Sequence, residues 1–304
     1  MEISFHLIKP YFEKYFEKVG VCPIEHLDRE ILFLEKWLKQ GKHGKMQYLE
    51  NHLDIRKNPK LLLENAQTAI VVLKNYYTQS KPKWFNPNAK ISNYAWGKDY
   101  HQVIKNRLEE ILCSLKKIIG NFSYRICVDT APLMDKVWAK KAGLGWIGKN
   151  TNLIHPKMGS YFFIGTVLVD FQITHSTVIM KDYCGTCNRC IEACPTHALK
   201  PYEIDASKCI SYLTIELKDD IPQEFENQLN GWAYGCDICQ QVCPWNRFSQ
   251  EHQEPLFEPL DLSFLFQVSE LQNLSNKKFQ KKLQVSAIQR ISKKKWLMNL
   301  RRLR

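Results

Sequence analysis

Residues 184–195 read CGTCNRCIEACP and residues 236–244 read CDICQQVCP, and these two cysteine runs decide the fold of the segment around them. The first run spaces four cysteines as C-x2-C-x2-C-x3-C before a proline, and the second keeps the last three of those positions and the proline. Cys209, in the insertion between the runs, supplies the missing position, so eight thiols are available. Four thiols for each of two centres is a common ligand set for paired iron–sulfur clusters.

The first run has the spacing of bacterial ferredoxins, in which three thiolates hold one [4Fe-4S] cluster and the fourth crosses to the other. We therefore predict a ferredoxin-like domain with two clusters over residues 179–248. The crossing rule assigns the first cluster to Cys184, Cys187, Cys190 and Cys243, and the second to Cys194, Cys209, Cys236 and Cys239. Two zinc sites of four thiolates each are the alternative, because CxxC pairs also suit tetrahedral zinc.

Eleven cysteines occur in the 304 residues, and the N-terminal sequence lacks the uninterrupted apolar segment of a secretory signal. The cytosol keeps thiols reduced, so a cysteine-rich pattern there indicates metal binding or catalysis. No stretch approaches the roughly 18 apolar residues of a membrane span. We expect a cytoplasmic protein with no membrane contact. Three further cysteines are expected to be small core residues, namely Cys22, Cys113 and Cys127.

Strand and helix patterns alternate ahead of the cysteine runs, and they predict an α/β (α+β) domain over residues 1–178. A polar loop rich in Pro and Asn follows the first strand and extends to about residue 98. The predicted helices span residues 3–19, 25–40, 99–119 and 133–142, and the predicted strands span 68–77, 124–129 and 160–170.

The segment VDTAPLMD at residues 128–135 places Asp129 at the end of a predicted strand, where open α/β sheets bind ligands. Asp129 is a candidate general acid, and this role needs a pKa raised toward neutrality by apolar neighbours such as Trp138. The alternative is that Asp129 caps the helix that begins near Pro132. Asp135 is expected to be a surface acid that stabilises the first turn of that helix.

The segment KKAGLGWIGKN at residues 140–150 is rich in glycine. It is not a phosphate-binding P-loop, because GxxxxGK[ST] is absent, and its GxGxxG follows a predicted helix instead of a strand. We interpret the glycines as allowing the backbone to approach a bulky ligand, with a packing turn as the alternative. The nine histidines include no HExxH pair, and no DxHxxG sequence occurs.

Five longer motifs together resemble one family. VDTAPLMDK, AGLGWIGKN, CGTCNRCIEACPTHAL, CISYLTIEL and YGCDICQQVCPWNRF have the order and spacing seen in epoxyqueuosine reductases, the cobalamin-dependent enzymes that complete queuosine synthesis in tRNA. The resemblance extends from about residue 46 to 250. It implies a large domain that binds base-off cobalamin, which agrees with the missing DxHxxG, and two clusters that deliver electrons to the cobalt.

The resemblance also implies the reaction and its site residues. The reaction is a two-electron reduction of the epoxide of epoxyqueuosine at the tRNA wobble position, with electrons from an external flavodoxin or ferredoxin system. Asp129 matches the family's proton donor to the departing epoxide oxygen. The segments that border the corrin in the family contain Arg56, Lys149, Asn150 and Ser211. We expect the protein to act as a monomer.

Residues 249–304 are expected to form a short helical basic tail that contacts tRNA. From residue 271 to 304 there are eleven Lys or Arg and no Asp or Glu, which accounts for nearly all of the net charge of +12. Basic segments gain affinity for nucleic acid by releasing counterions, and Phe279 and Trp296 fit an amphipathic helix lying against an anticodon stem-loop. A solvated basic end without a partner is the alternative.

Three other functions fit parts of the pattern. A cobalamin-dependent reductive dehalogenase shares the implied cofactors, but such proteins usually carry a twin-arginine signal, and none is present. A non-enzymatic electron carrier would bind no cobalamin. An RNA-binding protein with structural clusters would have clusters that do not change oxidation state.

Overall fold

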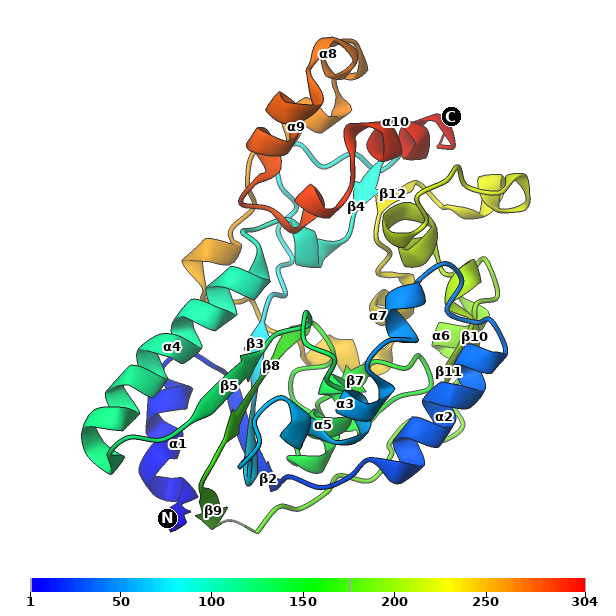
Figure 1. Ribbon diagram of the computed structural model, residues 1–304. Helices are drawn as coiled ribbons and strands as arrows, with labels where there is room; N and C mark the ends of the chain where they lie inside the picture. The colour runs from blue at the N-terminus through cyan, green and yellow to red at the C-terminus, as the bar shows by residue number, and fades with distance from the viewer. Residues whose placement is uncertain (1, 175, 304) are drawn as a thin grey trace.

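The centre of the molecule is a four-stranded antiparallel sheet in the order β2-β3-β8-β5 (Figure 1). The computed structural model describes residues 2–174 and 176–303. β3 (Thr68–Asn75) pairs with β2 (Lys18–Pro23) and β8 (Phe162–Val169), and β5 (Tyr124–Cys127) pairs with the other side of β8. The mixed α/β class is confirmed, but the antiparallel sheet has no switch point between parallel strands. The topology of the sheet therefore does not locate the ligand site, which must be found from the side chains that could form it.

The helix predicted over residues 3–19 is present but shorter, because the chain there forms β1 (Glu2–Ser4), α1 (Phe5–Glu13) and then the start of β2. The helical periodicity ends where the segment Val19-Gly-Val-Cys22 begins to pair with β3. A side chain at Gly20 would overlap the carbonyl oxygen of Ala142, so this strand requires glycine at its closest approach to the neighbouring chain. Sheet pairing thus overrides the local helical pattern.

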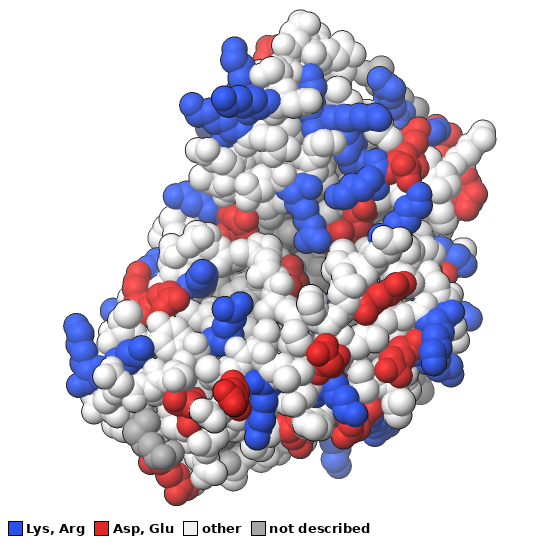
Figure 2. Space-filling model, viewed as in Figure 1, with Lys and Arg blue, Asp and Glu red and all other residues white. Residues whose placement is uncertain are grey.

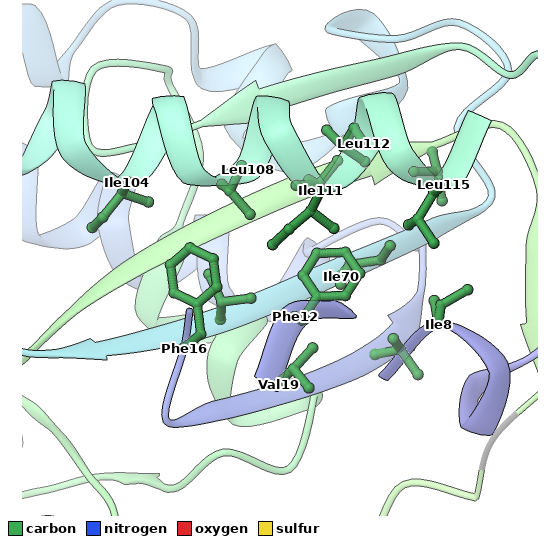
Figure 3. Close-up of a cluster of buried hydrophobic side chains, with 14 of the residues drawn as sticks. Ile8, Phe12, Phe16, Val19, Ile70, Ile104, Leu108, Ile111, Leu112 and Leu115 are labelled. Atoms are coloured by element: carbon green, nitrogen blue, oxygen red, sulfur yellow. The ribbon is translucent and has the colours of Figure 1, made fainter. Parts of the chain in front are cut away.

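Helices cover both faces of the sheet. On one face α1 and α4 (Tyr100–Ile119) pack apolar side chains onto the strands, with Ile8, Phe12, Ile104 and Leu108 all fully buried (Figure 3). On the other face α5 (Asp135–Lys141) inserts Trp138 among residues of β3 and β8. All eight residues of β3 are buried for this reason. The three layers give the strand ends a rigid base.

The remaining elements lie beside the sheet or, like α8, α9 and α10, beyond one end of it (Figure 1). The cysteine runs fold around α6 and α7, and the insertion between them contains a π-helix, η5 (Tyr212–Glu216). The other helices are α2 (Asp28–Lys39), α3 (Leu53–Lys57), α6 (Arg189–Glu192), α7 (Ile238–Gln241), α8 (Val268–Asn273), α9 (Asn276–Leu283) and α10 (Lys293–Arg301). The other strands are β4 (Lys90–Ile91), β6 (Trp146–Ile147), β7 (Leu153–Ile154), β9 (Gln172–Thr174), β10 (Leu199–Lys200), β11 (Glu203–Ile204) and β12 (Trp232–Tyr234).

The C-terminal region is a packed part of the fold and not a helix that offers its aromatic face to a ligand. Phe279 and Trp296 are fully buried in one cluster with residues of the polar loop, including Trp96, so the expectation that they face RNA is wrong. The indole nitrogen of Trp296 donates a hydrogen bond to the Leu265 carbonyl at 2.7 Å. β4 of the polar loop pairs in parallel with β12 of the cysteine segment. The loop and the C-terminal region therefore form one body.

The cysteines outside the runs divide into two kinds. Cys22 and Cys127 are buried, as predicted. Cys113 is exposed, so its assignment to the core is wrong, because α4 turns Ile111 and Leu112 inward and leaves Cys113 on the outer face. Among the described residues, none of the helices combines the length and hydropathy that crossing a membrane requires.

Candidate active site and cluster centres

A cavity of about 920 Å³ opens between the sheet, the C-terminal region and the π-helix η5. Figure 2 shows it as the hollow near the middle of this face. Its wall combines residues from segments far apart in the sequence, among them Tyr48, His52, Arg56, Asp99, His101, Asp129, Asp135, Glu216, Gln289 and Arg290. The cavity thus unites Asp129 and Arg56, two of the residues that sequence reasoning selected.

Asp129 lies two residues beyond β5, at the point where the chain reverses. Its φ of 58° is in the left-handed region, which Asp tolerates better than most residues with a side chain. The Oδ2 atom accepts a hydrogen bond from the Tyr100 hydroxyl at 2.8 Å and lies 3.3 Å from Nε2 of His101. The side chain is 53% exposed, and it lines the cavity. Asp129 is therefore held in place and accessible to a ligand.

The electrostatics of Asp129 differ from the expectation for a lone buried acid. The hydrogen bond with His101 lowers the pKa of Asp129, helped by the bond from Tyr100, and these effects outweigh the opposing effect of burial. The predicted rise of this pKa through apolar burial is thus wrong. The capping alternative is wrong as well, because α5 begins at Asp135 and its N-cap residue is Met134.

His101 connects Asp129 to a second carboxylate. Its Nδ1 lies 2.6 Å from Oδ1 of Asp99, the residue that caps α4. The other oxygen of Asp99 accepts a hydrogen bond from the Gln289 amide at 3.0 Å. Burial lowers the pKa of His101, but hydrogen bonds to Asp129 and Asp99 outweigh it and raise the pKa to about 9. At neutral pH the three side chains form a chain of two anions and one central cation.

Asp135 and Arg56 place unpaired polar atoms on the cavity wall. Oδ1 of Asp135 and Nε of Arg56 are buried and have no hydrogen-bond partner within the part of the chain that the structure describes. Burial raises the pKa of Asp135 to about 8, and the nearby charge of Asp129 adds to the rise. Asp135 is therefore not the surface acid that its helical position indicated. It is a neutral carboxyl group that can donate a hydrogen bond.

The glycine-rich segment packs against the protein itself. A side chain at Gly145 would overlap the carbonyl of Ile154, and a side chain at Gly143 would lie 2.9 Å from the Val178 carbonyl. Their φ values of 155° and 73° also favour glycine. The packing-turn alternative is therefore correct, and the prediction that these glycines approach a bulky ligand is wrong.

Lys149, Asn150 and Ser211 lie near the cysteines. The ammonium group of Lys149 donates hydrogen bonds to the Gly185 carbonyl at 2.7 Å and to the Asn188 side chain at 3.0 Å. Asn150 is buried, and its amide donates to the Cys239 carbonyl at 3.3 Å. The backbone N–H of Ser211 interacts with the Cys209 thiol. None of these three is among the residues that line the large cavity in the described structure.

The cysteines fall into two neighbouring groups. One group lines a small cavity of about 80 Å³ and consists of Cys184, Cys187, Cys190 and Cys243. In the other group the Cys209 thiol lies within electrostatic range of Cys194, Cys236 and Cys239. Cys239 is also within range of Cys190, so the groups adjoin. Each group offers four sulfur donors, which is the donor set of a [4Fe-4S] cluster.

Sequence reasoning did not identify Tyr100, His101, Asp99, Asp135 or Arg290 as site residues. Asp99 directly before a helical pattern indicates an N-cap, and the adjacent Tyr-His pair lies in the first turn. That signal locates the start of the helix. It does not predict that Tyr100 and His101 contact Asp129, because this contact depends on the packing of α4 against the sheet.

The fold and the cysteine groups define an iron–sulfur protein with an adjoining ligand cavity. Residues 183–246 match the family described as 4Fe-4S double cluster binding domain, and residues 56–130 match the family described as Epoxyqueuosine reductase QueG, DUF1730. The chain is 52% identical over 244 residues to the epoxyqueuosine reductase of Leadbetterella byssophila, with 80% of each chain covered. It is 46% identical to that of Cellulophaga algicola, with 90% of this chain and 89% of the relative covered. The chain belongs to the epoxyqueuosine reductase family, oxidoreductases of queuosine biosynthesis.

Solved structures agree with this assignment. A crystal structure of epoxyqueuosine reductase with an epoxyqueuosine-modified stem loop of tyrosine tRNA superposes with a TM-score of 0.85 at 28% identity, covering 97% of this chain and 79% of that chain. The Bacillus subtilis enzyme, solved with an aspartate-bearing catalytic loop swung out of the active site, has a TM-score of 0.84 at 27% identity over the same shares of the two chains.

Proposed function

We propose that this chain reduces the epoxide of epoxyqueuosine in tRNA and yields queuosine and water. The observation that carries the proposal is the position of Asp129, an aspartate that is fixed by two neighbours yet accessible, on the wall of a cavity of about 920 Å³. The family assignment supplies the reaction. The structure with a modified stem loop, solved for a relative, supports tRNA as the substrate.

Cobalamin is the proposed occupant of the cavity, and the wall suits a large polar ligand. Arg56 presents an unpaired donor and Asp135 an unpaired carboxyl oxygen, both buried, as expected for groups that a ligand satisfies. The bound cobalamin supplies low-potential two-electron reduction. Arg56 and Asp129 are the proposed contacts on this wall. Contacts of Lys149, Asn150 and Ser211 with cobalamin stay predictions, and these residues lie beside the cysteines and not on the wall of the large cavity.

Two [4Fe-4S] clusters are proposed to carry electrons toward the cavity. We assign the first cluster to Cys184, Cys187, Cys190 and Cys243, and the second to Cys194, Cys209, Cys236 and Cys239. The small cavity lined by the first group and the electrostatic proximity within the second support this assignment. The reaction consumes two electrons, so the chain depends on an external donor of the flavodoxin or ferredoxin kind.

Asp129 is the proposed proton donor to the departing epoxide oxygen. An alkoxide is a poor leaving group, so the C–O bond breaks more readily when its oxygen takes a proton in the same step. Tyr100 fixes the carboxyl group from one side and His101 from the other, and this restricts it to one orientation. The side chain contributes proximity, orientation and a proton.

The C-terminal region supplies the proposed tRNA surface. Four of its basic side chains form ion pairs or hydrogen bonds with other parts of the protein: Arg290, Lys293, Lys295 and Arg302. The exposed basic side chains of α9 and α10 gather beside the hollow (Figure 2), and they are Lys277, Lys278, Lys281, Lys282, Lys294 and Arg301. An anticodon stem-loop lying on this surface would bring its wobble nucleotide to the cavity.

Three further predictions accompany the proposal. We retain the division into a catalytic domain over residues 1–178, a cluster domain over 179–248 and a tRNA-binding region over 249–304. We also retain the monomeric state and the cytoplasmic location.

The test is an anaerobic reaction of the protein with cobalamin, a chemical reductant and a stem-loop RNA that contains epoxyqueuosine, analysed by nucleoside mass spectrometry. The expected result is loss of one oxygen atom from the modified nucleoside. Cobalamin binding with reduced clusters but an unchanged nucleoside would overturn the proposal. In that case a halogenated aromatic substrate would test the dehalogenase alternative in the same assay.

A further inference from the structure

The imidazole of His101 lies between two carboxylates. Its Nδ1 is 2.6 Å from Oδ1 of Asp99, and its Nε2 is 3.3 Å from Oδ2 of Asp129. A carboxylate only accepts hydrogen bonds, so both contacts are made at once only when both ring nitrogens carry a proton. The geometry therefore selects the imidazolium form of His101.

Neighbouring side chains fix this arrangement from several elements. The Tyr100 ring stacks on the His101 ring at 4.0 Å between centroids and on Phe163 of β8 at 4.1 Å. Gln289 of the C-terminal region holds the far oxygen of Asp99 at 3.0 Å. The titratable and charged groups that face this chain are Asp99, Tyr100 and Asp129 themselves, and four groups that interact electrostatically with Asp129, namely Tyr48, Asp135, Lys136 and Arg290.

Both hydrogen bonds to Asp129 end on Oδ2. Within the described structure no hydrogen bond ends on Oδ1, so this oxygen is available to a ligand in the cavity. Asp129 thus has one oxygen directed toward a proton source and one that is free for the substrate. This is the arrangement that a proton relay requires.

We infer that His101 is a positioning residue that stores the proton which Asp129 transfers to the departing epoxide oxygen. The inference rests on the proposed function and extends it by naming the group that supplies Asp129 with its proton. Two electrons enter the substrate as one epoxide C–O bond breaks. The Nε2–H bond of His101 breaks as its proton passes to Asp129, and Asp129 gives a proton to the departing oxygen, which leaves neutral imidazole, the Asp129 carboxylate and a hydroxyl group on the substrate. A second proton, taken from solvent through Asp129, releases that hydroxyl group as water when the second C–O bond breaks.

The electrostatics agree with this role. Burial disfavours the charged ring, yet the hydrogen bonds to Asp129 and Asp99 raise the pKa of His101 to about 9, while His101 lowers the pKa of Asp129. The proton therefore resides on the ring at neutral pH. Asp135, whose burial raises its pKa to about 8, is the competing proton source on the same wall.

The first test compares pH profiles of single-turnover epoxide reduction by the cluster-loaded, cobalamin-loaded protein. The unmodified protein should lose activity on the alkaline side near pH 9, where His101 deprotonates. In His101→Gln the amide can still donate to Asp129 but cannot store a proton. Asp129 must then hold the proton at its ordinary pKa of about 3.9, so the alkaline loss should begin at least two pH units lower.

Matched variants distinguish the storage of a proton by His101 from a purely structural role in holding the Asp129 carboxyl group in place. Tyr100→Phe removes a hydrogen bond to the same oxygen but stores no proton, so its rate should fall while the alkaline loss stays near that of the unmodified protein. Asp99→Asn should move the alkaline loss to lower pH, because it removes one of the anions that stabilise the imidazolium. A uniform fall in rate in His101→Gln, with the profile unmoved, would overturn the inference. A profile moved by Asp135→Asn and not by His101→Gln would transfer the role to Asp135.

A second measurement is independent of turnover. In protein with carbon-13 at histidine Cε1, the resonance absent from the His101→Gln spectrum should titrate with a midpoint near 9. A midpoint near the ordinary value of about 6.5 would overturn the inference even if epoxide reduction is observed. Absence of any reduction by the unmodified protein would instead count against the proposed function, and this titration would still decide the state of His101.

Discussion

Asp129 and Asp135 lie on the same cavity wall in opposite protonation states. The pKa of Asp129 is lowered, chiefly by the hydrogen bond with His101, whereas the pKa of Asp135 is raised to about 8, chiefly by burial. Two carboxyl groups six positions apart in sequence therefore differ because one has a cation beside it and the other has none close enough to offset desolvation. Their replacement should have different consequences.

Replacing Asp129 with Asn should lower the rate of epoxide reduction by about 10²–10⁴-fold, the usual contribution of a positioned acid. The amide keeps the size of the carboxyl group, so the clusters and the cavity should be retained. The rate should be measured by nucleoside mass spectrometry, with iron content and cobalamin absorbance as controls. Near-normal turnover would remove Asp129 from the proton-donor role.

Replacing Asp135 with Asn should change how stability depends on pH. The folded-state pKa of Asp135 is raised, so between about pH 4 and pH 8 the folded protein binds a proton that the unfolded chain has released. Stability from this group is therefore present at low pH and is lost as the pH rises toward 8. The variant should show a flatter profile of denaturation midpoint against pH, and an unchanged slope would contradict the assignment.

Replacing Cys209 or Cys243 with Ser should each remove one cluster and about half of the iron and acid-labile sulfide, because the two residues belong to different groups. Cys113→Ser is the matched control, because Cys113 is exposed on α4 and should leave the metal content unchanged. Anaerobic iron, zinc and sulfide analysis decides the result. Stoichiometric zinc without sulfide would establish the zinc alternative.

Reversing charge at Lys277, Lys278, Lys281 and Lys282 should weaken binding of the stem-loop RNA. The dependence of affinity on salt should also become less steep, because fewer counterions are released when RNA binds. Lys14→Glu together with Lys117→Glu is the control, since these exposed lysines lie at the C-terminal cap of α1 and on α4, two helices that are distant from α9 (Figure 1). Titration of labelled stem-loop at several salt concentrations measures both quantities. Equal losses in the two variants would remove α9 from the RNA surface.

Replacing Trp296 with Ala should destabilise the protein by about 3–5 kcal/mol, the usual cost of emptying a fully buried aromatic site. The loss of its hydrogen bond to Leu265 contributes to this cost. Leu32→Ala is the control, because Leu32 is 65% exposed and should change stability little. Chemical denaturation of both variants checks the difference, and equal midpoints would contradict the packing described for the C-terminal region.

The features of this fold that could be predicted are those determined by residues close together in the sequence. The spacing of Cys184, Cys187 and Cys190 predicts a cluster centre without reference to the rest of the chain, and the β-branched run of β3 predicts a buried strand. Asp129 could be selected because its motif is local too. These features need only neighbouring residues in sequence.

The parts that could not be predicted depend on distant contacts. The predicted helix ran to residue 19, but Lys18 and Val19 belong to β2, because they pair with the edge of β3. Trp296 is buried because the polar loop and the C-terminal region share one core. The contact of His101 with Asp129 joins residues 28 positions apart on different elements, and no local pattern encodes it.

The position of Gln289 and Arg290 on the cavity wall determines when the cavity can be complete during synthesis. A nascent chain that has emerged only as far as α7 has the sheet and both cysteine runs, but it lacks Gln289 and Arg290. Domains generally fold as the ribosome releases them, so the clusters can be assembled before this wall is complete. If the cavity holds the proposed cobalamin, its capture is therefore expected to be the last event of maturation.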